Sequence, residues 1–220
     1  MWQVSGMSFE NQIPAIESSA LWRAQQAIKR GLDLLLASLA LIALSPVLLA
    51  IAFAIRVTSG APILFEWRVI GKDGAPFTGY KFRTMIADAE KLKDALMHLN
   101  EMQGPVFKIA NDPRITPVGR FLRKHSLDEL PQLWSVLKGD MSLVGPRPPL
   151  VSEFEKFTDE QKQKLRVKPG MTSLWQVSGK PKNFDEWLRL DLEYIERWSL
   201  WLDAVILFKT TLIVLTGQNH

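Results

Sequence analysis

The sequence contains no cysteine and only three histidines, His98, His125 and His220. Without cysteine the chain has no disulfide framework and no thiolate ligand for a metal. The histidines are far apart in the sequence, so a histidine-rich metal site is not expected either. The sequence also lacks a Walker loop, a G-x-S-x-G elbow, a dinucleotide fingerprint, internal repeats and low-complexity tracts. These absences exclude the familiar P-loop, α/β-hydrolase and Rossmann enzyme classes.

The composition indicates a single basic domain with an affinity for anions. The length of 220 residues is that of one domain, and the net charge of +4 suits nucleic acid, a membrane surface or a phosphorylated substrate. Eight tryptophans are many for a basic soluble domain and favour an interface between water and lipid. Residues 1–28 show no strong periodicity and no secretory signal, so we expect a loosely ordered N-terminal lead with an amphipathic turn at Leu21–Ile28.

Leu34–Ile55 is an apolar stretch of 22 residues without a charge. That length is enough for a helix that crosses a hydrocarbon core of about 30 Å. However, Ser45 and Pro46 lie near its middle, where proline breaks a helical hydrogen bond and a serine hydroxyl can satisfy the freed carbonyl. Basic residues flank both ends, which favours both ends on the cytoplasmic side. A spanning helix and a re-entrant helix–break–helix with its membrane bend at Ser45–Pro46 both remain open, and the flanks favour the second.

The stretch Asn111–Pro149 combines an acidic pair with many cations. Asp128 and Glu129 are adjacent, and the surrounding cations are Arg114, Arg120, Arg123, Lys124, Lys138 and Arg147. Ser126 is a candidate N-cap with Glu129 as its capping-box partner, followed by leucines at helical spacing up to Leu137. A surface helix with a well-formed N-terminus is one interpretation. The other is a site that binds phosphates and a divalent cation, since arginine forks onto phosphate and carboxylate recruits Mg²⁺.

The remaining segments have simpler patterns. We expect a β-hairpin within Ala61–Arg83, which places Lys81 and Arg83 at its end, and an amphipathic helix at Ile86–Met102. A short charged helix is expected at Phe154–Leu165, and a loop at Val167–Lys180. In that loop Trp175 either covers the core or stacks on a nucleobase. Two helices are expected within Asn183–Leu215, the second lying either at a membrane interface or in the core.

Several motifs together resemble one family. They are KRGLDLLLASLALIALSPVLL, GYKFRTM, NDPRITPVGRFLRKHSLDELPQ, LVGPRPPL, VKPGMTSLWQVSGK and YIERWSLWLDAVILFKT. In this order they resemble the bacterial sugar transferase family, the monotopic polyprenyl-phosphate phosphoglycosyl transferases, over roughly Lys29–Leu215. The resemblance implies a mostly helical α/β fold in a single membrane-embedded domain. It places a re-entrant hairpin at residues 29–58 and a catalytic domain on the cytoplasmic face at residues 59–220, with a C-terminal interfacial helix.

The resemblance also implies a reaction. It is the transfer of a sugar-1-phosphate from a UDP-sugar to polyprenyl (undecaprenyl) phosphate at the bacterial inner membrane, which releases UMP and opens exopolysaccharide, capsule or O-antigen assembly. By resemblance, Asp128 is the nucleophile of a covalent aspartyl-phosphosugar intermediate. Glu129, together with Asp128, is the ligand of Mg²⁺, with Mn²⁺ as an alternative. The further residues implied are Lys81 and Arg123 in catalysis, and Arg83, Arg114, Arg147, Gln176 and Lys180 in substrate binding.

The sequence departs from the family at two positions. Ser173 stands where relatives commonly have glycine, and Lys180 stands where they usually have arginine. Because lysine cannot form a bidentate fork on phosphate, the second change puts the grip on the diphosphate in doubt.

Two other functions stay open. One is another aspartyl-phosphate phosphotransferase or phosphatase, and the other is a non-catalytic basic membrane adaptor. The chain lacks the D-x-D-x-[TV] arrangement of the first, and neither accounts for the acidic pair among its cations. We expect membrane lipids but no nucleic acid as partners, and the apolar surfaces would support a homodimer. The sugar is not specified, although LWQVSGK favours a hexose-1-phosphate. The chain reads as either a short natural form or an excised catalytic domain.

Overall fold

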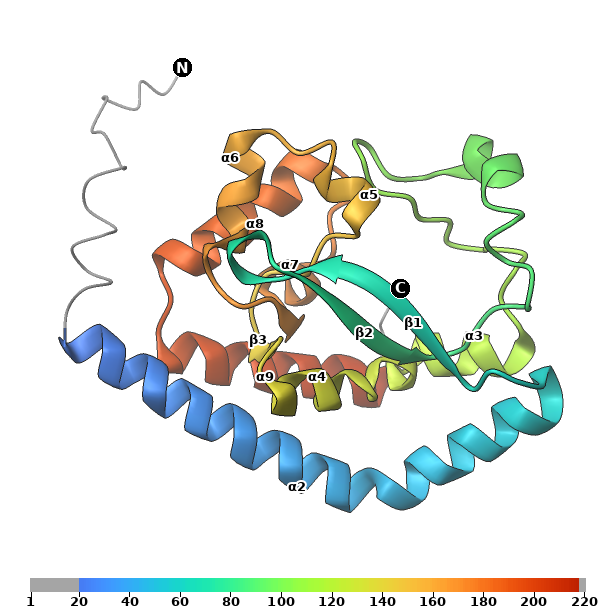
Figure 1. Ribbon diagram of the computed structural model, residues 1–220, viewed down its shortest axis with the longest axis horizontal. Helices are drawn as coiled ribbons and strands as arrows, with labels where there is room; N and C mark the ends of the chain where they lie inside the picture. The colour runs from blue at the N-terminus through green and yellow to red at the C-terminus, as the bar shows by residue number, and fades with distance from the viewer. Residues whose placement is uncertain (1–19, 218–220) are drawn as a thin grey trace.

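The computed structural model describes residues 20–217, and most of its regular structure is helical (Figure 1). The longest helices are α2 (Ala20–Ser59), α8 (Phe184–Glu196) and α9 (Leu200–Thr216). The shorter helices are α3 (Pro117–Lys124), α4 (Gln132–Lys138), α5 (Val151–Phe154), α6 (Asp159–Lys162) and α7 (Leu174–Val177). Single 3₁₀ turns are η2 (Lys72–Gly74), η3 (Asp94–Leu99), η4 (Leu127–Glu129) and η5 (Gln163–Arg166). The expected mostly helical fold is thus confirmed.

Helix α2 is one continuous helix with a bend, rather than two helices separated by a break. Pro46 lies inside it, and Figure 1 shows the ribbon bent near its middle with both ends turned toward the rest of the protein. Pro46 has no N–H to donate to the carbonyl of Ile42, and the Ser45 hydroxyl donates to that carbonyl instead at 2.8 Å. The serine therefore does what the sequence predicted of it, and the helix continues through the bend. Residues 20–28 of the expected lead belong to α2, and its residues 1–19 lie outside the described part.

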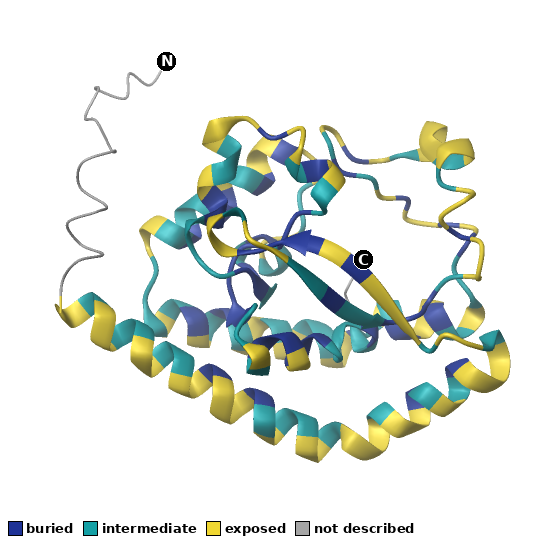
Figure 2. Ribbon diagram, in the orientation of Figure 1, coloured by how far each residue is buried: buried dark blue, intermediate teal, exposed yellow. Residues whose placement is uncertain are grey.

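Both halves of α2 pack against the rest of the protein. Ala37 in the first half is buried in a cluster with α4, β3 and α9, whereas Ile51 and Ile55 in the second half pack on Phe82 and Leu122. The opposite face of the helix is exposed and apolar, as the yellow outer side of α2 in Figure 2 shows. This helix is long and apolar enough to cross a membrane, with little of its length buried in the protein. It could therefore be embedded in a bilayer.

A buried polar network fixes the first half of α2. Lys29 contacts Asp203 of α9 at 2.5 Å and donates to the carbonyl of Val144 at 3.1 Å. Tyr194 of α8 donates to the same two groups, at 2.8 Å to Asp203 and at 3.1 Å to Val144. One turn along α2, the carboxylate of Asp33 accepts from the backbone N–H of Leu143. The network thus joins α2, α8 and α9 to the strand that ends at Val144.

The strands form two small sheets. The predicted hairpin is confirmed: β1 (Leu64–Ile70) and β2 (Pro76–Phe82) are antiparallel around η2. The second sheet pairs β3 (Ser142–Val144) with β4 (Gly170–Thr172) in parallel. Gly145 and Gly170 lie so close together that a Cβ on Gly170 would come within 2.0 Å of the Gly145 nitrogen. Glycine at both positions therefore lets the chain after β3 lie directly against β4.

Helices α8 and α9 confirm the two helices expected near the C-terminus. Trp187 of α8 stacks on the buried Trp175 with ring centroids 4.4 Å apart, and the Trp175 indole donates to the carbonyl of Pro181. Trp175 is therefore a core residue and is not available to a nucleobase. Helix α9 buries Asp203 and Ile206 on one side and exposes apolar side chains such as Phe208 on the other. One side of α9 is therefore part of the core, and its other side exposes the apolar surface that an interfacial helix would need.

Two expected helices are wrong. Ile86–Met102 forms turns and the short η3, and its leucines at positions 92 and 99 stay exposed. A short helix without a buried face is only marginally stable, because packing supplies most of its stability. Phe154–Leu165 is divided by a turn before the Thr158 cap into α5, α6 and η5.

A buried ion pair joins η5 to α8. Lys164 and Asp191 are 2% and 0% exposed and form a salt bridge. Burial raises the pKa of Asp191, and the Lys164 charge opposes this rise. The Lys164 ammonium also lies 5.0 Å from the centre of the Trp187 ring, so little water reaches it. Each charge therefore depends on the other for compensation.

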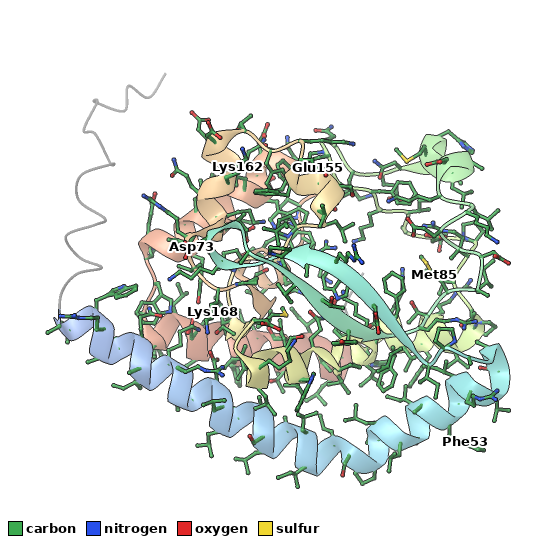
Figure 3. The ribbon with its side chains drawn as sticks, in the orientation of Figure 1. Phe53, Asp73, Met85, Glu155, Lys162 and Lys168 are labelled. Atoms are coloured by element: carbon green, nitrogen blue, oxygen red, sulfur yellow. The ribbon has the colours of Figure 1, made fainter. Side chains whose placement is uncertain are left out.

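The bend in α2 can be tested with spin labels. The chain has no cysteine, so labels at Leu35→Cys and Phe53→Cys are unique; both side chains are exposed, and Figure 3 shows Phe53 on the outer side of α2. These positions are five turns apart on one face, about 27 Å in a straight helix. We expect Pro46→Leu to restore the Ile42 hydrogen bond and straighten the helix. The interlabel distance, measured by double electron–electron resonance, should then shorten toward that value, because labels on the convex side of a bend are splayed apart.

A second label pair provides the control. Leu21 and Leu39 are also exposed, have the same spacing, and both precede the bend. Their distance should not change in the Pro46→Leu variant. An unchanged distance between positions 35 and 53 would show that packing of the two halves, and not Pro46, sets the bend.

The buried pair gives a prediction for stability. Asp191→Asn removes the counter-charge of a buried ammonium, so we expect it to lower the free energy of unfolding by about 3–5 kcal/mol.

The matched control is Asp159→Asn, which removes the partner of Lys162 from a pair whose aspartate is 99% exposed. Denaturant unfolding in detergent should show little change for that variant. Equal stability of the two variants would contradict a structural role for the buried pair. The double variant Lys164→Met/Asp191→Leu should regain most of the loss.

Candidate active site

Asp128 and Glu129 lie in η4, between α3 and α4. Asp128 is 9% exposed and Glu129 is half-buried. The predicted capping box is wrong: Ser126 has a left-handed backbone (φ 52°) and makes no capping hydrogen bond from its side chain. An N-cap residue needs an extended backbone, and Pro131 further divides the predicted helix, so that α4 begins at Gln132. The pair therefore lies on a tight turn and not in the first turn of a long helix.

Lys81 comes to this pair from β2. Its ammonium contacts a carboxylate oxygen of Glu129 at 2.5 Å and lies 4.3 Å from the centre of the Trp67 ring. Trp67 pairs with Gly79 across the hairpin, where a Cβ would come within 2.3 Å of the indole nitrogen. Glycine thus lets the indole lie flat across β2, beneath the lysine that carries the positive charge.

Arg123 comes to the pair from α3. Thr116 caps this helix by accepting from the backbone N–H of Gly119 at 3.0 Å. A Cβ on Gly119 would lie 2.0 Å from the carbonyl oxygen of Thr84, so the helix can approach that segment only with glycine there. The approach lets the Arg123 Nε donate to the Thr84 hydroxyl at 2.9 Å. The arginine is thereby held where its charge acts on Asp128.

Arg147 lies on the proline-rich turn after β3. The turn is braced on one side by the N–H of Gly170, which donates to Pro146, and on the other by the N–H of Ile70, which donates to Pro149. The guanidinium lies 5.3 Å from the centre of the Trp187 ring, and its charge acts on Glu129. Two prolines and a tryptophan thus hold this cation at the site.

The loops of the C-terminal part supply Lys180 and Gln176. Lys180 is half-buried, and the charges of Glu129, Arg147 and Asp128 all act on it. Gln176 and Glu129 both line a cavity between α7, α9 and the β3–β4 sheet. The structure therefore brings together six of the predicted site residues around Asp128, namely Glu129, Lys81, Arg123, Arg147, Lys180 and Gln176.

The ionisation of the acidic pair is unequal. Burial raises the pKa of Asp128 to about 6, and the adjacent Glu129 charge contributes to the rise while Lys81 and Arg123 oppose it. Burial also raises the pKa of Glu129, but Lys81 and then Arg147 lower it to a net value below the ordinary one. Burial lowers the pKa of Lys180 to about 8, aided by the charge of Lys108. Glu129 is therefore firmly ionised, whereas the nearby cations only partly compensate the negative charge of Asp128.

Two predicted substrate ligands have structural contacts instead. Arg83 is 9% exposed and donates to the carbonyls of Ser59, Ala61, Pro62 and Met85. Because those carbonyls use all three of its nitrogens, the structure favours a role for Arg83 in joining the end of α2 to the hairpin. Arg114 is 5% exposed, pairs with Asp112 at 2.6 Å through Nη2, and donates to the carbonyl of Ala89. Its contacts likewise favour a structural role.

Lys108 lies near the site but was not among the predicted site residues. It is exposed at the edge of a loop that Asn100 holds through hydrogen bonds to residues 102, 106 and 108. Surrounding atoms lower the pKa of its ammonium by desolvation, and the charge of Arg147 lowers it further. Lys108 thus belongs to the same cationic cluster as Arg123, Arg147 and Lys180. Only the folded path of its loop distinguishes it from the other lysines.

Asp128 and Glu129 are the carboxylates of this site that could hold a divalent cation. No group of three or more histidine, aspartate or glutamate side chains forms a metal cage within residues 20–217. Mg²⁺ does not need such a cage, since it commonly binds one or two carboxylates, several waters and the phosphates of a substrate. The repulsion that raises the pKa of Asp128 is the kind that a divalent cation relieves. The residues present therefore fit Mg²⁺ bound together with a phosphorylated substrate.

Comparisons with known proteins point the same way. The sequence model of the bacterial sugar transferase family matches residues 24–217 of this chain. The galactosyl transferase CpsE of Streptococcus agalactiae is 47% identical over 193 residues, which are 87% of this chain and 43% of CpsE. The undecaprenyl-phosphate galactose phosphotransferase of Salmonella typhimurium is 40% identical over 94% of this chain and 44% of its own length. The exopolysaccharide production protein ExoY of Sinorhizobium fredii is 41% identical over 83% of both chains.

The chain thus spans less than half the length of the first two relatives and most of the third. The matched region runs through α2, the hairpin, the acidic pair with all of its surrounding cations, and α9. Since one family's pattern covers the membrane helix and the site together, this chain belongs to the bacterial sugar transferase family.

Proposed function

We propose that the protein transfers a sugar-1-phosphate from a UDP-sugar to undecaprenyl phosphate and releases UMP. The observation that carries the proposal is a buried aspartate, Asp128, whose neighbours are an acidic partner and a set of cations. Relatives of this chain carry names that specify undecaprenyl-phosphate transfer of galactose, glucose and N-acetylgalactosamine units. A reaction of this class would supply lipid-linked sugar to exopolysaccharide, capsule or O-antigen assembly.

In the first step, a carboxylate oxygen of Asp128 attacks the phosphorus that bears the sugar. The new bond is an acyl phosphate between Asp128 and the sugar-phosphate, and the bond that breaks is the phosphoanhydride to UMP, which leaves with the bridging oxygen. Arg123 and Lys81 are the cations whose charges act most on Asp128, so they are placed to offset the charge of the attacked phosphate. Burial keeps water from hydrolysing the acyl phosphate.

In the second step, a phosphate oxygen of undecaprenyl phosphate attacks the same phosphorus. The bond between this phosphorus and the Asp128 oxygen breaks, so the products are undecaprenyl-diphospho-sugar and the free Asp128 carboxylate. Since the lipid phosphate is anionic already, this step needs charge compensation more than a general base. Lys180, Arg147 and Lys108 form the cationic cluster available for that purpose.

Glu129 and Asp128 would hold Mg²⁺, which would supply positive charge to offset the charge of the substrate phosphates. Lys81 holds one oxygen of Glu129 and thereby sets the orientation of that carboxylate. Mn²⁺ would satisfy the same oxygen ligands.

The membrane arrangement is part of the proposal. Helix α2 would enter and leave one leaflet as a re-entrant helix bent at Ser45–Pro46, because both of its halves pack against the same catalytic part. Basic residues flank both ends, which favours the cytoplasmic face of the inner membrane for both. The catalytic part would then lie on the side where UDP-sugars are made, with α9 at the interface.

The nucleophile can be tested by UMP release. Purified protein in detergent with Mg²⁺ and undecaprenyl phosphate is supplied with UDP-galactose, UDP-glucose and UDP-N-acetylgalactosamine. We expect release from at least one donor, and a loss of at least about a thousandfold in Asp128→Asn because the amide cannot form the acyl phosphate. The active donor identifies the sugar.

The exposed-charge variant Asp159→Asn serves as the control and should keep the parent rate. Trapping labelled sugar-phosphate on the parent protein, but not on Asp128→Asn, would show the covalent step directly. A phosphatase would release inorganic phosphate, whereas a non-catalytic adaptor would release nothing from any donor. Full activity in Asp128→Asn would remove its role as nucleophile.

The metal role predicts a shifted Mg²⁺ requirement. Glu129→Gln keeps the size of the side chain but weakens a metal ligand, so the Mg²⁺ concentration for half-maximal rate should rise about tenfold or more. Initial rates across a Mg²⁺ titration measure this, and EDTA should abolish the parent activity. If Lys81→Met produces the same shift as Glu129→Gln, the effect would come from the lost ion pair and not from a lost ligand.

A further inference from the structure

A cavity of about 170 Å³ opens beside Glu129, on the side of the site that faces α9. Its walls come from the β3–β4 sheet, α7 and α9, and are mainly apolar. The apolar side chains that line it include Leu143, Met171, Val177, Leu207 and Ile213. We call this cavity the α9 pocket.

One wall of the α9 pocket is also the apolar outer surface of the protein. Ile213 lines the pocket, while its neighbour Leu212 and the nearby Phe208 are 46% and 65% exposed on the outer side of α9. The Thr172 and Thr210 hydroxyls hydrogen-bond to each other at 2.6 Å, and Thr210 also donates to the carbonyl of Ile206, so both hydroxyls already have partners within the protein. A ligand in the pocket would therefore meet an apolar lining that lies one helix away from the exposed apolar face.

The chemistry of the lining selects among the parts of the two substrates. Apart from the two threonines, the polar side chains of the lining are Ser126, Gln176 and Glu129. A sugar or a nucleotide in such a pocket would therefore lose more hydrogen bonds to water than it could replace. An isoprenoid phosphate instead joins its anionic group directly to an apolar chain, so it needs cations and an apolar slot side by side. An apolar cavity of about 150 Å³ holds benzene, so the α9 pocket has room for about one five-carbon isoprene unit.

We propose that the α9 pocket binds the isoprene unit next to the phosphate of the lipid acceptor. The acceptor phosphate would then lie at the mouth of the pocket, where Glu129 meets Lys81 and the other site cations. The rest of the chain would pass the end of α9 into the bilayer. This inference rests on the proposed function and assigns the acceptor subsite within it.

The test fills the pocket and separates the two half-reactions. Ile213→Trp places a large ring in the pocket from α9, and Val177→Phe does so from α7. We expect the KM for undecaprenyl phosphate to rise about tenfold or more in both, because the isoprene unit loses its apolar contacts. Exchange of labelled UMP into the UDP-sugar needs no lipid and should keep the parent rate. Leu212→Trp, on the outer face of α9, is the matched control and should leave the KM unchanged.

A short acceptor distinguishes the pocket from the membrane surface. With farnesyl phosphate, which is soluble without a bilayer, the filled variants should show the same rise in KM. A rise confined to undecaprenyl phosphate, or an equal rise in Leu212→Trp, would mean that membrane seating was disturbed and would overturn the proposal. An unchanged KM in folded Ile213→Trp and Val177→Phe would overturn it too, as expected if a phospholipid acyl chain occupies the cavity. Absence of UMP exchange in the parent would instead refute the proposed function itself.

Discussion

The carboxylate of Asp203 is the group on which the arrangement of the helices depends. It is 7% exposed, and three donors satisfy it: Lys29 of α2, Tyr194 of α8, and the Trp198 indole. A buried carboxylate that loses its partners costs several kcal/mol, so these elements are held in one relative position. The carbonyl of Val144 accepts from both Lys29 and Tyr194, which draws the end of β3 into the same network. Because the Arg147 turn follows directly, the orientation of the membrane helix and the position of a site cation are set together.

At its other end, α2 is fixed by Arg83, whose guanidinium donates to the carbonyls of Ser59, Ala61 and Pro62. The helix is therefore hydrogen-bonded to the catalytic part on both sides of its bend. The bend costs one backbone hydrogen bond, which the Ser45 hydroxyl replaces. This explains why a proline in the centre of an apolar helix is compatible with a continuous helix. The same contacts give Arg83, a cation in a motif next to the site, a structural role at the end of α2.

The elements that depend on local sequence were predictable, and those that depend on packing were not. The hairpin, α8, α9 and the role of Ser45 follow from periodicity, turn residues and the chemistry of proline. The capping box failed because Pro131 and the left-handed backbone of Ser126 break the pattern that the leucines suggest. The helix expected at residues 86–102 failed because it has no partner to bury its leucines against. At the site, Arg83 and Arg114 were indistinguishable in sequence from Arg123, and Lys108 from any surface lysine, since only the folded chain decides which cations meet carbonyls and which face the acidic pair.

The two sides of Asp128 and Glu129 differ in a way that suits substrates of opposite solubility. One side carries Arg123 in the last turn of α3, with Arg147 and Lys108 on loops, and a charged nucleotide can arrive there from water. The other side opens into the apolar α9 pocket, one helix away from exposed apolar side chains. In a direct transfer, the donor and the acceptor would have to be bound at the same time. The negative charges of the donor phosphates and of the acceptor phosphate would then lie close together. The proposed covalent relay through Asp128 would require only one set at a time, because UMP would carry away about two negative charges before the lipid phosphate binds. The modest number of fixed cations around Asp128 would then be enough, because the same cations would serve the donor first and the acceptor afterwards.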